Sequence, residues 1–299
     1  MITVFMRIFD PSELDKLQKR LETPDNGQVT IIGGSDLFHG APILSLKACS
    51  RVVDMVYFSS PEPSVGKVAE NLKSRLSSFI WVPWEEVGEY IKKSDAVLIG
   101  PGMKRYRSEK DTDRDIEGIF DKDGTQTKFI TEKFLREFPE KKWVVDGGAL
   151  QTMDARWIPE GAILTPNYKE FQILFKIKIQ NAKFKIAVQN SKLRELVSKK
   201  AREHKCVIVL KGPVTYVCSP EECVEVHGGN NGLTKGGTGD VLAGLTVGLA
   251  AKNEPFLSAC CAAWIVKKAA DYLYERVGTV YNSDDLTEEI RLVLGKYLK

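Results

Sequence analysis

Four glycines lie within eight residues, between positions 232 and 239, directly before an aspartate and a long apolar run. The stretch reads GLTKGGTGDVLAGLTVGLAA (232–251), and its apolar part is a helix candidate that begins at Asp240. Glycines before a helix let the backbone approach an anion, and the first N–H groups of a helix have no internal partner. We therefore expect a nest of N–H donors for a phosphate or a transferring phosphoryl group, formed by Gly236, Gly237, Thr238 and Gly239.

Asp240 has two interpretations at this position. A carboxylate in the first turn of a helix is stabilised by the helix dipole, and it often acts only as a cap. Alternatively, the carboxylate is a general base that takes a proton from a substrate hydroxyl while that oxygen attacks phosphorus. The surrounding glycines favour the general base, so Asp240 is the predicted catalytic residue. The stretch matches neither the GxxxxGK[ST] phosphate loop nor a GxGxxG motif after a strand.

Short apolar runs alternate with helical patterns along most of the chain. This alternation predicts a three-layer α/β/α fold with a mostly parallel central sheet that is covered on both faces. Segment 214–226 has two strand-like pieces around a Ser-Pro-Glu-Glu turn, which predicts a β-hairpin. The other predicted strands are 28–34, 53–59, 79–82, 95–100, 142–147, 162–166 and 206–212, and the predicted helices include 41–52, 64–76, 240–251, 255–277 and 284–298.

No linker divides the chain, so we expect one domain over residues 1–299, interrupted by a charged segment at 103–127. That segment is either a solvated loop or a lid or subunit contact above the strand ends. The formal net charge is only +3, from 43 basic and 40 acidic residues, which favours neither nucleic acid nor a membrane as partner.

The cysteines and the amino terminus indicate a cytoplasmic location. The six cysteines include no CxxC pair and no histidine at metal-ligand spacing, so the sequence assigns no metal site. Cys206, Cys260 and Cys261 stand in apolar runs and are expected to be buried thiols. The first residues do not have the pattern of a signal peptide, and no run is long enough for a membrane span.

The glycine-rich stretch resembles the signature of the ADP/ATP-dependent NAD(P)H-hydrate dehydratases, a family of the ribokinase-like superfamily. The usual form is G-N-P-G-M-A-T-G-G-x-G-D followed by V-L-[ST]-G. Here GNNGLTKGGTGDVLAG (229–244) has Asn231 in place of the proline, and Lys235 adds an unusual cation. Five further segments are similar to family motifs in the same order: GGSDLFHGAP (33–42), LIGPGM (98–103), VVDGGALQ (144–151), ILTPNYKEF (163–171) and VIVLKGPVT (207–215).

The resemblance implies a ribokinase-like fold and an enzyme that repairs hydrated NADH or NADPH, in which water has added across a nicotinamide double bond. Such enzymes use ADP or ATP, with Mg²⁺ expected, to phosphorylate the added hydroxyl and then eliminate phosphate with help from the ring nitrogen. The resemblance also implies a homo-oligomer. It gives roles to matching positions: catalysis to Asp240, nucleotide contacts to Lys211, Gly212, Pro213, Thr215 and Gly239, and contacts with the hydrated dinucleotide to Ala41, Gly102, Asn167 and Asp240.

Three positions differ from the family motifs. Asn167 stands in place of a histidine, Gly148 in place of an aspartate and Gln151 in place of an asparagine. Because asparagine does not titrate, we expect a changed substrate pocket beside unchanged phosphate-handling residues. These differences support the alternative of a small-molecule kinase of the same superfamily, acting on a vitamin precursor or a sugar. A non-catalytic nucleotide sensor is a third hypothesis, although nucleotide binding alone does not need Asp240 as a base.

Overall fold

One sheet of ten strands forms the centre of the computed structural model, which describes residues 5–74, 76–106, 122–177 and 186–298. Strand β9 is antiparallel to both of its neighbours, and the other strand pairs are parallel. The order across the sheet is β1 (Phe5–Ile8), β10 (Glu222–Val226), β9 (Thr215–Cys218), β8 (Val207–Leu210), β7 (Ile163–Leu164), β6 (Lys142–Val145), β5 (Ala96–Ile99), β2 (Gln28–Ile32), β3 (Met55–Ser59) and β4 (Ile80–Trp81).

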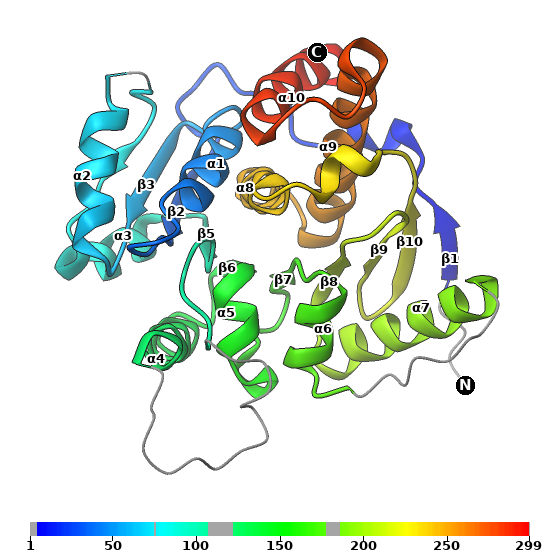
Figure 1. Ribbon diagram of the computed structural model, residues 1–299, viewed down its shortest axis with the longest axis horizontal. Coiled ribbons are helices and arrows are strands. Elements are labelled where there is room, and N and C mark those ends of the chain that lie inside the picture. The colour runs from blue at the N-terminus through cyan, green and yellow to red at the C-terminus, as the bar shows by residue number, and fades with distance from the viewer. Residues whose placement is uncertain (1–4, 75, 107–121, 178–185, 299) are drawn as a thin grey trace.

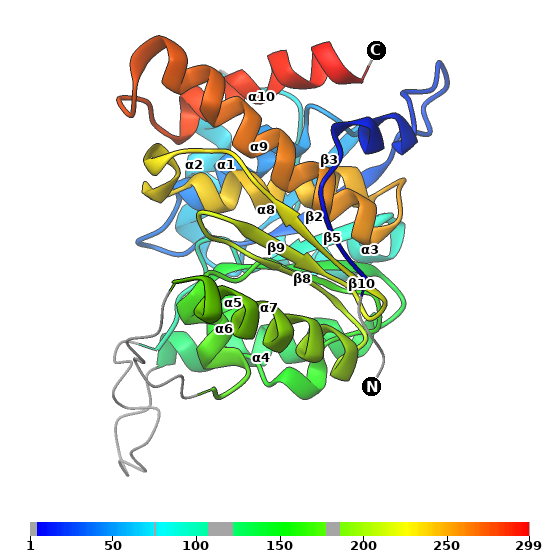
Figure 2. The ribbon, with the colours of Figure 1, turned by 90° about the vertical axis from the view of Figure 1, so that its right-hand side faces the viewer.

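Helices cover both faces of this sheet, as Figures 1 and 2 show, and the predicted three-layer fold is confirmed. No helix within the described residues is both long and apolar enough to cross a membrane. One face is covered by α1 (Gly40–Cys49), α2 (Pro63–Leu72), α8 (Thr238–Ala250), α9 (Pro255–Val277) and α10 (Ser283–Tyr297). The other is covered by α3 (Val87–Lys93), α4 (Lys122–Glu137), α5 (Gly147–Thr152), α6 (Tyr168–Leu174) and α7 (Ile186–Glu203).

Two segments differ from the sequence-based expectation. The first described residues form an edge strand, β1, which was not expected, and Arg7 in it bonds the Glu222 side chain of β10 at 3.2 Å. The charged segment 103–127 is partly helical, because α4 already begins at residue 122. Its residues 107–121, on which the expected loop or lid depends, lie outside the described part of the chain.

The predicted hairpin is confirmed, and a disulfide joins its two strands. Cys218 of β9 lies opposite Cys223 of β10, and the two sulfur atoms are bonded. This pair was not predicted from the sequence. The remaining cysteines are buried free thiols, as expected for Cys206, Cys260 and Cys261.

We expect denatured, unreduced protein to expose four reactive thiols, the number of free cysteines, and two more after reduction. A thiol reagent counted by mass spectrometry measures both numbers. Cys218→Ser should also lower the free energy of unfolding by about 2 kcal/mol, since the bond closes a short loop in the unfolded chain. Free reaction of Cys218 and Cys223 in unreduced protein would contradict the disulfide.

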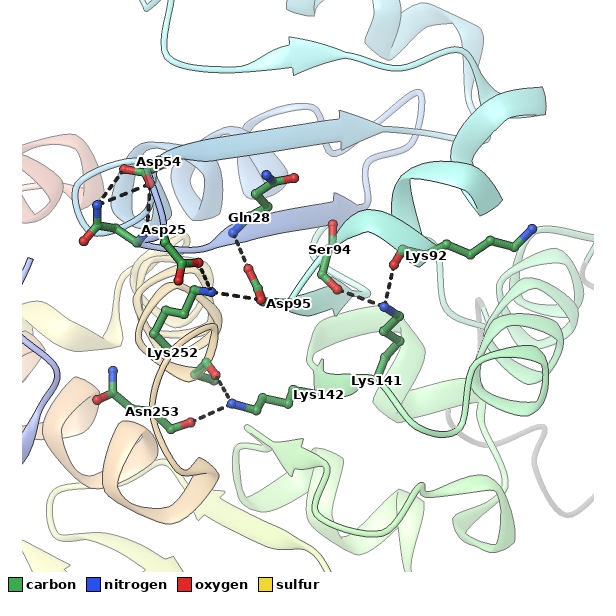
Figure 3. Close-up of polar contacts among 12 residues, drawn as sticks. Asp25, Gln28, Asp54, Lys92, Ser94, Asp95, Lys141, Lys142, Lys252 and Asn253 are labelled. Atoms are coloured by element: carbon green, nitrogen blue, oxygen red, sulfur yellow. Dashed lines mark hydrogen bonds and ion pairs between the residues drawn. The ribbon is translucent and has the colours of Figure 1, made fainter. Parts of the chain in front are cut away.

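Two adjacent lysines at the start of β6 bond the carboxyl ends of two helices, α8 and α3 (Figure 3). The Lys142 ammonium donates to the carbonyls of Ala250 and Asn253, both at 3.1 Å, at the end of α8. The Lys141 ammonium donates to the carbonyls of Lys92 at 2.7 Å and Ser94 at 3.0 Å, at the end of α3. Because neighbouring residues of an extended chain point to opposite faces, the two lysines reach helices on opposite faces of the sheet. Their positive charges stabilise the carboxyl ends of these helices. The end of α8 remote from Asp240 is therefore fixed to the sheet.

Candidate active site

The expected site residues gather where the parallel strands end. Gly102 follows β5, Asn167 follows β7 and Lys211 follows β8, while Ala41 is the second residue of α1, after β2. Strands β2 and β5 are neighbours, but the chain continues from them toward opposite edges of the sheet. Open α/β sheets bind ligands outside the carboxyl ends of their strands, at such a switch point.

The glycine-rich loop presents backbone donors at the start of α8. Gly237 has a φ of +93°, and an added Cβ would lie 2.5 Å from a Leu44 methyl carbon, so the loop needs glycine there. Among the described residues, no oxygen accepts a hydrogen bond from the N–H groups of Gly236, Gly237 or Gly239. The Thr238 N–H, in contrast, donates to the Lys235 carbonyl at 3.5 Å, and the Thr238 hydroxyl donates to the Leu233 carbonyl at 2.7 Å. The three glycine amides therefore remain available to an anion.

Asp240 lies one residue after these amides and is partly buried. Its carbonyl accepts a hydrogen bond from the Ser45 hydroxyl at 2.8 Å, which joins α8 to α1. Burial raises the pKa of the Asp240 carboxyl to about 7; the Asp146 carboxylate contributes in the same direction, and the Lys211 ammonium opposes it. A carboxyl with a pKa near the working pH can exchange protons with a substrate.

Lys211 connects the glycine-rich loop to two buried carboxylates. Its ammonium donates to Asp146 Oδ1 at 2.9 Å and lies 3.7 Å from Glu170 Oε2. It also lies 3.1 Å from where a Cβ on Gly239 would be, directly beside the nest. Burial lowers the pKa of the Lys211 ammonium, but the two carboxylates outweigh it and raise the pKa overall. Lys211 therefore stays charged next to the glycine amides.

Asp146 and Glu170 lie within the sequence motifs, but neither was predicted to be a site residue. Asp146 is 2% exposed and also accepts a hydrogen bond from the Thr165 hydroxyl at 2.7 Å. Glu170 is 7% exposed, and burial raises the pKa of its carboxyl. One feature of the sequence could have identified Asp146: it directly follows an apolar strand, β6, whose carboxyl end lies beside that of β5.

The other residues of the expected nucleotide segment form the turn after β8. Gly212 and Pro213 are exposed, so a ligand can reach them. Thr215 is buried, and its hydroxyl lies 3.4 Å from the Gly212 carbonyl within the same turn. The structure brings Lys211 to the nest and directs the Thr215 hydroxyl back into the turn.

Ala41 and Gly102 lie against each other between α1 and the end of β5. Gly102 has a φ of +69°, and a Cβ on it would lie 3.2 Å from the Ala41 Cβ and 2.4 Å from the Phe38 carbonyl oxygen. One turn beyond Ala41, the backbone of α1 touches α8, because a Cβ on Gly244 would lie 2.1 Å from the Ser45 carbonyl oxygen. Ala41, Gly102 and Asp240 therefore belong to one closely packed wall.

Each of the three departures from the family motifs has a structural role. The Asn167 side chain caps α6, accepting from the N–H groups of Lys169 at 2.9 Å and Glu170 at 3.0 Å. Gly148 packs under residue 103, because a Cβ on it would lie 2.1 Å from the Met103 carbonyl oxygen. The Gln151 amide donates to Glu170 Oε1 at 3.3 Å. Two of the three changes thus act on the position of Glu170.

Comparisons with known proteins agree with this arrangement. A model of the NAD(P)H-hydrate dehydratase family matches residues 29–292. The chain belongs to this family. A relative within it, the bifunctional NAD(P)H-hydrate repair enzyme Nnr of Methanocaldococcus jannaschii, is 33% identical over 95% of this chain and 51% of its own length. The chain thus spans about half the length of the bifunctional relatives that it matches.

Shorter members of the NAD(P)H-hydrate dehydratase family match over nearly their whole length. The ADP-dependent (S)-NAD(P)H-hydrate dehydratase of Nitrosopumilus maritimus is 28% identical over 99% of this chain and 97% of its own. Among solved structures, the ADP/ATP-dependent NAD(P)H-hydrate dehydratase of Bacillus subtilis, co-crystallised with ATP and Mg²⁺, has a TM-score of 0.73 at 20% identity. That match covers 97% of this chain and 98% of the other, and it supports the fold.

Proposed function

We propose that this protein dehydrates hydrated NADH or NADPH, using ADP or ATP as the phosphoryl donor. Family membership and the names of the relatives support the reaction class. The observation that carries the proposal is the position of Asp240, one residue after the free amides of Gly236, Gly237 and Gly239. A non-catalytic nucleotide sensor needs the amides but has no use for a partly buried carboxylate of raised pKa beside them.

The proposed reaction divides between the nest and the carboxylate. The amides of Gly236, Gly237 and Gly239, with the Lys211 ammonium, stabilise the terminal phosphoryl group as its charge develops. Asp240 accepts the proton of the added hydroxyl while that oxygen bonds to phosphorus and the bridging phosphoanhydride bond breaks. Electrons of the ring nitrogen then expel phosphate, and a proton leaves the adjacent carbon. Hydrated NADPH and ATP thus give NADPH, ADP, phosphate and a proton.

Mg²⁺ is part of the proposal as a companion of the nucleotide. Within the described residues, no three histidine, cysteine, aspartate or glutamate side chains are grouped to hold a metal. This fits Mg²⁺, which commonly binds through substrate phosphates, water and one or two carboxylates. Asp146 and Glu170, which pair with Lys211, would hold the ion through water. When bound, the ion neutralises phosphate charge.

The test combines the purified protein with hydrated NADH, Mg²⁺ and either ADP or ATP. We expect the absorbance of reduced nicotinamide to return together with one released phosphate per turnover. A phosphorylated product that persists, without recovery of absorbance, would indicate the small-molecule kinase instead. Failure to recover absorbance with either nucleotide would reject the dehydratase.

The activity should depend on pH through Asp240. Burial, with help from Asp146, raises the pKa of this carboxyl to about 7, and only its ionised form accepts a proton. We therefore expect kcat/KM to be constant above about pH 7 and to fall roughly tenfold per unit below it. Measuring kcat/KM against pH at saturating nucleotide checks this decrease. An unchanged rate at pH 5 would contradict the assignment of Asp240 as the base.

We also propose a cytoplasmic location and a homo-oligomeric state. The substrate class supports the location, because hydrated cofactors arise where NADH and NADPH are used. Exposed apolar side chains at the end of α9, Tyr274, Val277 and Val280, support self-association. Light scattering of the purified protein measures the state, and a monomer at micromolar concentration would reject it.

A further inference from the structure

A buried lysine, Lys267 on α9, bonds three backbone carbonyls. The residue is 5% exposed, and its ammonium donates to Gly212 at 3.2 Å, Pro213 at 2.8 Å and Gly228 at 2.9 Å. Gly212 and Pro213 form the turn after β8, whereas Gly228 follows β10. One side chain therefore holds two loops that are separated by the whole hairpin.

The second loop is shaped around this side chain. Gly228 and Gly229 have φ values of +94° and +76°, which favour glycine. A Cβ on Gly229 would lie 3.1 Å from Lys267 Cγ, so a side chain there would crowd the lysine stem. The two glycines let the chain pass around the lysine and present the Gly228 carbonyl to its ammonium.

The same helix holds this loop again before it reaches the glycine-rich nest. The Asn230 amide donates to the Ala270 carbonyl at 2.9 Å, one turn after Lys267. The Asn230 oxygen accepts from the Gly232 N–H and from the Tyr281 hydroxyl, both at 2.9 Å. Helix α9 therefore positions Gly228 and Asn230 of the 228–232 segment, which leads directly into the nest.

Lys267 is an unfavourable choice for a purely structural contact. Among the described residues it forms no ion pair, and burial lowers the pKa of its ammonium to about 8, with Asp271 on the same helix acting in the opposite direction. A buried ammonium without a bonded carboxylate disfavours folding, and an apolar side chain would fill the same space. Such groups occur more often at functional sites than in ordinary cores.

We propose that Lys267 is a positioning residue for the adenine nucleotide. Its ammonium fixes the Gly212–Pro213 turn against the loop that begins at Gly228, and these two segments supply the proposed nucleotide and phosphoryl contacts. The inference rests on the proposed function, since it assumes that an adenine nucleotide binds between these segments and α8. Lys267 acts through the backbone of the two loops and does not itself contact the ligand.

The experiment measures the dissociation constants of ADP and ATP, with Mg²⁺, by calorimetry on the folded protein without turnover. Lys267→Met keeps the length and apolar stem of the side chain but removes the donor. We expect its nucleotide affinity to fall roughly 10- to 100-fold, the effect of displaced binding groups, while NADPH binding is unchanged. Lys268→Met is the matched control, because Lys268 lies on the same helix and faces the Tyr272 ring at 4.7 Å.

The outcomes separate this inference from the proposed function. Equal nucleotide affinity in Lys267→Met and Lys268→Met, with binding by the unaltered protein, would overturn the role of Lys267 alone. No nucleotide binding by the unaltered protein would overturn both. Lys267→Gln, which keeps a neutral donor, should bind with intermediate affinity. If neither variant at 267 folds, the lysine is structural and the inference is wrong.

Discussion

Replacing Asp240 with asparagine should lower kcat roughly 10³-fold while leaving the affinity for ADP and ATP nearly unchanged. Asparagine has almost the same shape but cannot accept the hydroxyl proton at neutral pH. The amides of Gly236, Gly237 and Gly239 and the Lys211 ammonium remain in place to bind the nucleotide. Single-turnover recovery of nicotinamide absorbance measures the rate, and calorimetry measures nucleotide binding.

The same variant should be more stable than the unaltered protein above pH 7. Burial, with help from Asp146, raises the pKa of Asp240 to about 7, so the folded state binds its proton more tightly than the unfolded chain does. The contribution of this group to stability therefore decreases as pH rises from about 4 to about 7. Removing the charge should recover about 1–2 kcal/mol, measured by urea unfolding. An active Asp240→Asn enzyme would exclude Asp240 as the base.

Replacing Lys211 with methionine should damage both stability and turnover. The change leaves Asp146 and Glu170 without their cation, and an unpaired buried charge costs about 3 kcal/mol or more. Loss of the ammonium beside the nest should also lower kcat roughly 10²-fold. The pH below which activity falls should also increase, because the Lys211 ammonium no longer opposes the raised pKa of Asp240.

A surface lysine provides the matched control for that change. Lys205 forms an exposed pair with Glu160 at 3.3 Å, and such pairs contribute less than about 1 kcal/mol. Lys205→Met should therefore leave unfolding and turnover nearly unaltered. Adding Asp146→Asn to Lys211→Met should recover part of the stability, because one uncompensated charge is removed. Equal effects of the changes at 205 and 211 would show that Lys211 is not part of a buried charge cluster.

The sequence was sufficient for the layers and the hairpin, and it placed the start of α8 at Asp240, two residues after its position at Thr238. Buried parallel strands are nearly continuous apolar runs, as in Ala96–Ile99, and such runs stand out between amphipathic helices. Edge strand β1 was missed because its pairing with β10 depends on residues more than 200 positions away. The Cys218–Cys223 bond could have been predicted from the sequence, because the two cysteines flank the turn of a hairpin that was itself predicted.

The charge pattern of the site was harder to predict than its glycines. A glycine loop is local, whereas the contact of Lys211 with Asp146 joins the ends of strands β6 and β8, which have β7 between them. Local bonding was also hard to predict: the Thr238 N–H and the Thr215 hydroxyl both bond carbonyls within their own loops. Asn167 was interpreted as a change in the substrate pocket, and its side chain is occupied in capping α6.

The close crossing of α1 and α8 limits which parts of this protein can move during a reaction. With backbone against backbone at Gly244 and the remote end of α8 tied down by Lys142, Asp240 has little freedom to approach an incoming hydroxyl. Any closing motion that brings the reactants together must then come from elements other than α1 and α8. A fixed base and a moving phosphoryl donor would make turnover sensitive to solvent viscosity, a property that no single side chain in the site would reveal.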